Sequence, residues 1–179
     1  MRIDEAAMNG WRHGVFTMAR TVLAAAALGI AASVTALGIG EAAPPWVRPT
    51  AAGDPVALGK LKGRVVYVDF WASWCGPCRR SFPWMNEMQQ KYGARGFTVV
   101  GVNVDKRRPD ADRFLLQTPA AFTIVYDAAG ATPEAYAVKA MPSSYLIDAT
   151  GKVAAAESGF RDEQKAALEE RIRALLPQK

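Results

Sequence analysis

The feature that most limits the fold of this chain is a near-continuous apolar run that leads into its only two cysteines. The run GRVVYVDFW is rich in β-branched and aromatic residues from Val65 to Trp71, and the sequence Cys-Gly-Pro-Cys follows shortly after, at Cys75. A short run of this kind is typical of a strand buried on both faces of a sheet. Because Pro77 is tolerated in a helix only in its first turn, the next helix should begin at the cysteines. A buried strand followed directly by a helix predicts a layered α/β domain.

The rest of the chain continues this alternation of strands and helices. The first helix should run to about Tyr92, where Gly93 and Gly96 end it, and Pro83 should kink it because proline lacks a backbone donor. Strands are predicted at FTVVGVNVD, at FTIVYD and, as a pair joined at ATG, in SSYLIDATGKVAAAE. Helices are predicted at DADRFLLQ, at TPEAYAVK with Pro133 in its first position, and at DEQKAALEERIRALL. The inner side of the last helix would carry Ala167, Leu168, Ile172, Leu175 and Leu176. We therefore expect a partly parallel central sheet whose last strand pair is antiparallel.

The N-terminal residues differ in composition from the rest of the chain. Three arginines precede an uncharged run from Thr21 to Gly40. A basic flank, an apolar stretch and small residues at its end are typical of an export signal, here residues 1–43, with cleavage favoured after Ala42. A run of this length can also just span a bilayer, so an uncleaved inner-membrane anchor stays open. Either form predicts a periplasmic protein, with a linker at 44–54 and one domain at 55–179.

The overall charge is basic but points to no particular partner. The chain has 179 residues and a formal net charge of +5 at pH 7, which favours solubility and contact with anionic surfaces. The densest basic cluster, DKRRPD from Asp105 to Asp110, has no interleaved aromatic residues, so we expect a solvated loop there. Nucleic-acid binding is therefore not expected.

Two cysteines this close together could form a metal site, a structural disulfide or a reactive pair. Structural zinc usually needs four ligands, but the chain has no third cysteine and its one histidine, His13, lies in the predicted export segment. No metal site is therefore predicted, although two thiolates could hold a cuprous ion. A structural disulfide that closes so small a loop would add little stability. A reactive pair is favoured.

A reactive pair at a helix N-terminus has a specific chemistry. Unpaired backbone N–H groups and the helix dipole would stabilise a thiolate on Cys75 and lower its pKa. Cys78 would lie about one turn further along on the same face, shielded. Cys75 would attack a substrate disulfide to give a mixed disulfide, which Cys78 would then resolve. Asp69, a carboxylate within the buried run, is the candidate base for Cys78, because burial should raise its pKa. The alternative for Asp69 is an edge aspartate that faces water.

These residues resemble a known family. VDFWASWCGPC resembles the active-site strand and motif of thioredoxin. The domain from about Pro55 to Leu176 resembles the TlpA/ResA branch of exported thiol–disulfide reductases, which includes the cytochrome-c-maturation thioredoxins. The shared features are the export segment, FWASWC, a helix-and-strand insertion at about 110–126, and MPSSYLIDATGKV. The resemblance implies a thioredoxin-like α/β fold, in which a central mixed sheet is flanked by helices and carries this insertion. It also implies a redox-active Cys75–Cys78 disulfide and no other cofactor.

The resemblance further implies roles for individual residues. In the family the proline of the last motif is cis and faces the cysteines; here that proline is Pro142, and the backbone of Met141 would pair with an extended substrate. The implied substrate-binding set is Trp74, Gly76, Pro77, Met141 and Pro142. The branch often has glutamate at the position of Ser81 and commonly asparagine at that of Asp69, so its substrates are not carried over. The Gly-Pro pair between the cysteines is that of a reducing family member.

The favoured function is an exported protein-disulfide reductase. Its clients would be protein disulfides, such as those of apocytochrome c haem sites or copper-site assembly proteins. A membrane thiol-electron transporter would supply its electrons. Two other functions stay open. One is a copper-binding or delivery factor that uses both thiolates in oxidase assembly, and the other is a disulfide oxidase or isomerase.

Overall fold

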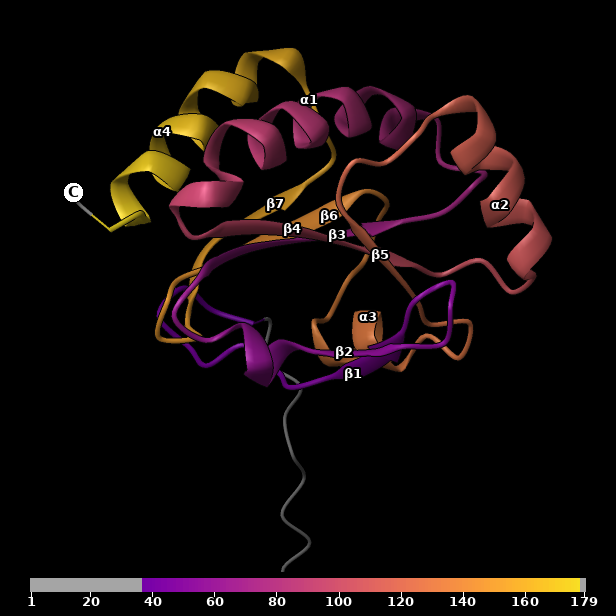
Figure 1. The fold of residues 1–179 in the computed structure, drawn as a ribbon, viewed down its shortest axis with the longest axis horizontal. Helices are drawn as coiled ribbons and strands as arrows, with labels where there is room; N and C mark the ends of the chain where they lie inside the picture. The colour runs from indigo at the N-terminus through magenta and orange to yellow at the C-terminus, as the bar shows by residue number, and fades with distance from the viewer. Residues whose placement is uncertain (1–36, 178–179) are drawn as a thin grey trace, which may run out of the picture. The chain divides into compact units, whose positions relative to one another are not determined.

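The computed structural model describes residues 37–177, which form a five-stranded mixed sheet with helices on both faces (Figure 1). The strand order is β5-β4-β3-β6-β7, with β3 (Val65–Trp71) at the centre. β3 pairs in parallel with β4 (Phe97–Asn103), which pairs in parallel with β5 (Thr123–Tyr126). On its other side β3 is antiparallel to β6 (Ser143–Ile147), and β6 is antiparallel to β7 (Val153–Ser158). The predicted partly parallel sheet with an antiparallel last pair is confirmed.

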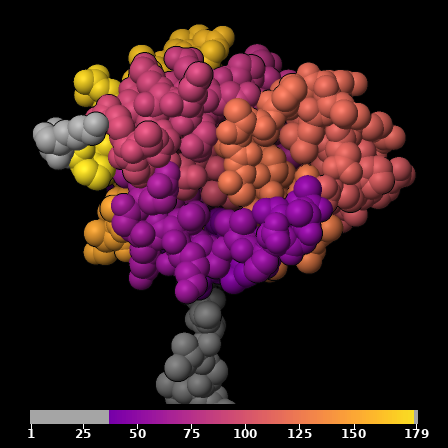
Figure 2. All heavy atoms as spheres, viewed as in Figure 1, coloured from indigo at the N-terminus to yellow at the C-terminus, as the bar shows by residue number. Residues whose placement is uncertain are grey.

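The helices cover the two faces of this sheet unequally. α1 (Gly76–Tyr92) and α4 (Lys165–Leu175) lie on one face, and the short α3 (Ala131–Ala135) lies on the other (Figure 1). α2 (Arg108–Gln117) lies beside the start of α1, and with the residues that follow it forms a block at one side of the surface (Figure 2). α2 and β5 are the predicted helix-and-strand insertion. Short 3₁₀ helices span Leu58–Leu61, Gly93–Arg95 and Asp162–Gln164.

The alternation of side chains along β3 divides the core into two clusters. Tyr67 and Trp71 face α1 and α4 and pack with the apolar side chains of both helices. Val68 and Phe70 face the opposite side, which α3 and the N-terminal segment cover. Asp69 falls between Tyr67 and Trp71 in this alternation, so its side chain points into the α1 layer. The alternation of side chains along β3 therefore places this carboxylate on the side of the helix that carries the cysteines.

Residues 44–54, expected as a linker, are part of the domain in the structure. They contribute β1 (Val47–Pro49), which pairs with β2 (Pro55–Ala57) in a separate antiparallel hairpin. Trp46, just before β1, is buried against the face of the central sheet that α3 also covers. The apolar area of Trp46, the ion pair of Arg48 with Asp127 and the hydrogen bond from the Tyr136 hydroxyl to the Pro44 carbonyl hold this proline- and alanine-rich segment on the domain.

Most of the predicted export segment lies outside the described residues, but its last residues pack on the domain. Gly40 N–H donates to the carbonyl of Val153 at 2.7 Å, and Val153 N–H donates to the carbonyl of Glu41 at 2.9 Å. Ala43 N–H donates to the carbonyl of Gly151 at 2.9 Å. Within residues 37–177, no helix is both long and apolar enough to cross a membrane.

Three smaller expectations are corrected. α3 begins two residues before Pro133, so this proline is not its first residue. Ala167 is exposed, because it lies on the same side of α4 as Arg171 rather than on the buried side that carries Leu168. Asp105 is buried rather than part of a solvated loop, because its carboxylate binds the segment before the cysteines.

Candidate active site

The two cysteines lie at the junction of β3 and α1 and form a disulfide, with their Cα atoms 5.4 Å apart. Cys75 is the N-cap of α1, and its Sγ accepts a hydrogen bond from the backbone N–H of Cys78 at 3.2 Å. Gly76 and Pro77 are the first two residues of the helix, as the sequence predicted. Once the disulfide is reduced, the same N–H and the helix dipole would stabilise negative charge on Cys75.

Exposure distinguishes the residues around the disulfide. Cys78 is fully buried, and Cys75 is 3% exposed. Trp74, directly before Cys75, is 69% exposed and is the only aromatic residue among the large exposed side chains of residues 37–177. The structure thus shields Cys78 and presents an apolar ring to solvent beside Cys75.

Asp69 is a buried carboxylate in the layer between the sheet and α1. It lies opposite Gly101 of β4 and Ser144 of β6 in the sheet register, and it is 1% exposed. Its Oδ2 has no hydrogen-bond partner among the described residues. Burial raises the pKa of this carboxyl well above its ordinary value of 3.8. The alternative of an edge aspartate facing water is therefore wrong, and the expected rise in pKa is confirmed.

The Met141–Pro142 peptide bond is cis, as the resemblance implied. Because Phe70 lies opposite Ser143 in the antiparallel register, Pro142 falls at the end of β3 from which the cysteines follow. Met141 is partly buried, and its backbone makes no backbone hydrogen bond to any other described residue. Its N–H and carbonyl are therefore available to an extended chain.

Asp105, which sequence reasoning did not select, fixes the segment that precedes the disulfide. Its two carboxylate oxygens accept hydrogen bonds from the backbone N–H and the hydroxyl of Ser73, both at 2.9 Å. A third hydrogen bond comes from the side-chain amide of Asn103, at 2.7 Å. The available signal was its place just after β4, since the carboxyl ends of parallel neighbours meet at one edge of a sheet. The basic residues that follow it in DKRRPD obscured that signal.

The side chains that pack with the two cysteines in the α1 layer are mostly aromatic or aliphatic. Trp71 is fully buried in the core, with its ring centroid 5.1 Å from that of Phe82 and 4.8 Å from that of Phe114. Trp84 and Met88 are likewise buried in this cluster. Ser81, at the position where the branch often has glutamate, is buried and donates its hydroxyl proton to the carbonyl of Cys78 at 3.0 Å.

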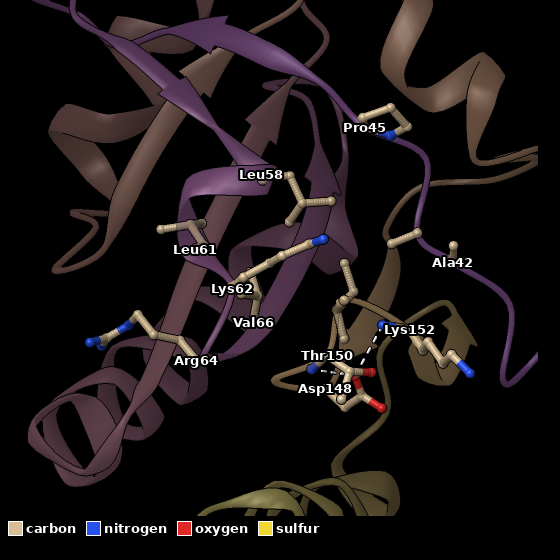
Figure 3. Close-up of a pocket in the computed structure, with 14 residues that line it drawn as sticks. Ala42, Pro45, Leu58, Leu61, Lys62, Arg64, Val66, Asp148, Thr150 and Lys152 are labelled. Carbon is tan, nitrogen blue, oxygen red and sulfur yellow. Dashed lines mark hydrogen bonds between the residues drawn. The ribbon is translucent and has the colours of Figure 1, made fainter.

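Neither a metal centre nor an enclosed ligand cavity adjoins the cysteines in the described residues. Within residues 37–177 no group of three or more His, Cys, Asp or Glu side chains is placed to hold a metal ion. An apolar pocket of about 380 Å³ lies at the opposite end of β3, between Leu58, Val66 and the β6–β7 turn with Asp148 and Thr150 (Figure 3). The disulfide itself lies where β3 ends and α1 begins, beside the exposed ring of Trp74.

Comparison with known proteins agrees with this arrangement. The Redoxin family model matches residues 39–172. The chain is 32% identical over 139 residues to the thiol-disulfide oxidoreductase ResA of Bacillus thuringiensis, covering 78% of this chain and 79% of the relative.

Two solved structures are also similar. A crystal structure from Chlorobium tepidum, described as a DsbE thiol:disulfide interchange protein, is 54% identical, with a TM-score of 0.75 and coverage of 78% of this chain and 98% of that one. The thioredoxin domain of a thiol-disulfide oxidoreductase from Bacteroides vulgatus is 28% identical, with a TM-score of 0.69 and coverage of 76% and 99%. With its capped disulfide and cis-proline, this chain belongs to the Redoxin family of the thioredoxin superfamily and groups with the ResA-like thiol–disulfide oxidoreductases.

Proposed function

We propose that this protein reduces disulfide bonds in other proteins through its Cys75–Cys78 dithiol. The observation that carries the proposal is the position of Cys75 Sγ at the N-cap of α1, where it accepts the Cys78 N–H, while Cys78 is buried behind it. A sulfur in this position is the more acidic and the more accessible of the two. It is therefore the one to begin exchange.

The proposed cycle transfers two electrons from the protein dithiol to the client. The Cys75 thiolate attacks the client disulfide, so that a Cys75–client S–S bond forms and the second client sulfur leaves as a thiolate. Cys78 then gives its proton to Asp69 and attacks Cys75. The intramolecular disulfide forms, and the first client sulfur leaves in its reduced form. Asp69 suits this step because burial raises its pKa, which makes its carboxylate a stronger base than an exposed one.

Two surfaces would hold the client during the exchange. The ring of Trp74 offers exposed apolar area beside Cys75. The backbone of Met141, before the cis-proline Pro142, would pair with an extended client segment on the other side of the disulfide. Gly76, which has open space where a Cβ would lie, and Pro77 would form the rest of this surface.

We further propose that the protein works in the periplasm, as a soluble protein after signal cleavage or as one anchored through its N-terminal apolar run. The composition of residues 1–43 supports export. Because such a compartment is oxidising, a membrane thiol-electron transporter would return the protein to its dithiol form. Cytochrome c or copper-site maturation would supply clients with paired cysteines.

The reduction potential of the Cys75–Cys78 pair tests the direction of the reaction. Equilibration with a dithiothreitol or glutathione redox buffer, followed by alkylation and mass analysis, gives this value. We expect a potential near that of thioredoxin, about −270 mV. A potential near about −120 mV, as in strong oxidants, would instead support disulfide formation. A Cys78→Ser variant, which should retain clients as mixed disulfides, would identify them.

A further inference from the structure

A small polar pocket adjoins the segment that carries the disulfide. Its volume is about 240 Å³, and it lies between the loop before Cys75, the first turns of α1, and α2. The pocket lies near the disulfide, because two of its lining residues, Ser73 and Arg79, come just before Cys75 and just after Cys78 in the chain. The lining residues are Ser73, Arg79, Asp110, Arg113, Phe114 and Gln117.

Arg79 is held in this pocket by contacts that leave its charge unneutralised. Its guanidinium carbon lies 4.6 Å from the centroid of the Phe114 ring, and its Nη1 donates to Gln117 Oε1 at 3.2 Å. The Thr118 hydroxyl lies at the limit of hydrogen-bonding distance, 3.5 Å from the same nitrogen. Within residues 37–177, no carboxylate lies within 4 Å of Arg79.

The one acidic side chain of the pocket is already shared by two arginines. Asp110 Oδ2 lies 3.4 Å from Arg107 Nε, and Asp110 Oδ1 accepts a hydrogen bond from Arg113 Nη2. Arg107 caps α2 and does not line the pocket, so the lining itself holds two arginines, Arg79 and Arg113, and one carboxylate, Asp110. A second carboxylate, Asp105, lies behind Ser73, and its oxygens accept hydrogen bonds from Ser73 and Asn103. The lining therefore carries one net positive charge, which the pairing of Asp110 with Arg113 leaves on Arg79.

We propose that this pocket binds the carboxylate of an Asp or Glu side chain that flanks the reacting cysteine of a client. A guanidinium presents its N–H donors in a planar fork that matches a carboxylate. The stacking of Arg79 on Phe114 and its bond to Gln117 hold that fork in place before the client arrives. Since Ser73 and Arg79 bracket the disulfide, a carboxylate here would come from a residue close to the client cysteine. This inference rests on the proposed function.

The test uses pairs of short peptides, each closed by one disulfide. Within a pair the peptides differ only by Glu or Gln at one position, and the pairs scan the two residues before and after the attacked cysteine. The protein is first reduced with dithiothreitol and desalted, and the rate constant for its oxidation by each peptide is measured by alkylation and mass analysis. At low salt we expect a Glu-to-Gln rate ratio of about 3 to 5 at one or more positions, the range of an exposed ion pair. The ratio should fall toward 1 at 0.5 M salt.

Arg79→Gln and Arg80→Gln form a matched pair of variants. Each removes one positive charge from the same turn of α1, but Arg80 does not line the pocket. Arg79→Gln should reduce the Glu-to-Gln ratio to about 1, whereas Arg80→Gln should keep it. Because the ratio compares two peptides with the same thiolate, a change in the acidity of Cys75 cancels.

Each result decides the inference. A wild-type ratio of 1 at every position, or a preference that survives in Arg79→Gln, would overturn the carboxylate subsite. If no peptide oxidises the reduced protein, the proposed function itself is wrong. Efficient exchange with the Gln peptides, without any preference for Glu, would leave the proposed function standing and remove only the subsite.

Discussion

Asp69 and Asp105 are both buried carboxylates, but their surroundings give them different tasks. Asp105 accepts three hydrogen bonds, two of them from Ser73, and so fixes the loop that leads to Cys75. Asp69 has an oxygen with no hydrogen-bond partner among the described residues, and burial raises its pKa. A satisfied carboxylate holds structure, whereas an unsatisfied one with a raised pKa can exchange a proton.

The role of Asp69 in the second half of the cycle can be tested with Asp69→Asn. The amide has nearly the same size but cannot accept the Cys78 proton. We expect the release of a client peptide from a mixed disulfide on Cys75 to slow by about 100-fold, within the usual range for a general base. The first attack by Cys75 should change by less than about threefold. Stopped-flow measurement of both steps would decide this, and equal release rates in the two proteins would exclude Asp69.

The same substitution should change how stability depends on pH. Because the pKa of Asp69 is higher in the folded than in the unfolded protein, the folded state binds its proton more tightly. That contribution is complete below about pH 4 and is lost as the pH rises through the folded pKa. Asp69→Asn has no such loss. Between pH 4 and the folded pKa, its free energy of unfolding should therefore gain on the wild type by up to about 1.4 kcal/mol per pH unit, which urea titrations at several pH values would show. A constant difference would contradict this.

At the scale of single elements, the start of α1 could be predicted from two residues in the sequence. Pro77 belongs to its first turn, and Cys75 takes the N-cap position that Ser or Asp often fills. The strand before it could be predicted because its run of β-branched and aromatic residues is typical of a strand buried on both faces, as β3 is. The β1–β2 hairpin could not, since its three-residue strands are mostly exposed and the neighbouring Trp46 packs against a sheet formed by distant residues.

The capped position of Cys75 predicts unequal reactivity of the two reduced thiols. Backbone N–H groups at the start of α1 favour a thiolate on Cys75, whereas Cys78 is fully buried. With limiting iodoacetamide at pH 7, Cys75 should be alkylated at least about tenfold faster than Cys78. Peptide mapping of the singly alkylated protein measures this ratio. Comparable labelling at both positions would show that the helix start does not activate its first sulfur.

At the scale of the whole molecule, local patterns predicted the alternation of strands and helices and the place of the cysteines, and the family resemblance implied the insertion. The parts that could not be predicted join segments distant in sequence. Asp105 and Ser73 meet because β4 and β3 end at one edge, and Arg79 meets Gln117 because α2 lies beside α1. Each contact depends on tertiary packing that no local pattern contains. A sequence therefore identifies the reactive cysteine pair here more readily than the pocket that we propose as a client subsite.

The N-terminal edge of the domain gives a prediction about its stability. Gly40 and Glu41 exchange two backbone hydrogen bonds with Val153, and Leu37 packs at the edge of the core. A chain that starts at Ala43 loses these contacts, while one that starts at Leu37 keeps them. We expect the shorter chain to be less stable by about 1 to 3 kcal/mol, at about 0.5–1.5 kcal/mol per hydrogen bond. Urea unfolding of both chains measures the difference, and equal midpoints would show that the segment adds nothing.

Residues 40–43 form backbone hydrogen bonds with residues at the β6–β7 turn. Because Ile147 lies opposite Val66, that turn is at the end where β3 begins, whereas the cysteines follow the end where β3 stops. If the protein is coupled to a solid support through its N-terminus, the chain therefore joins the domain at the end of β3 opposite the disulfide. On a resin that carries the Cys78→Ser variant in this way, Cys75 should face away from the support and be accessible to proteins of a cell-envelope extract. The fold thus provides the orientation that affinity capture requires.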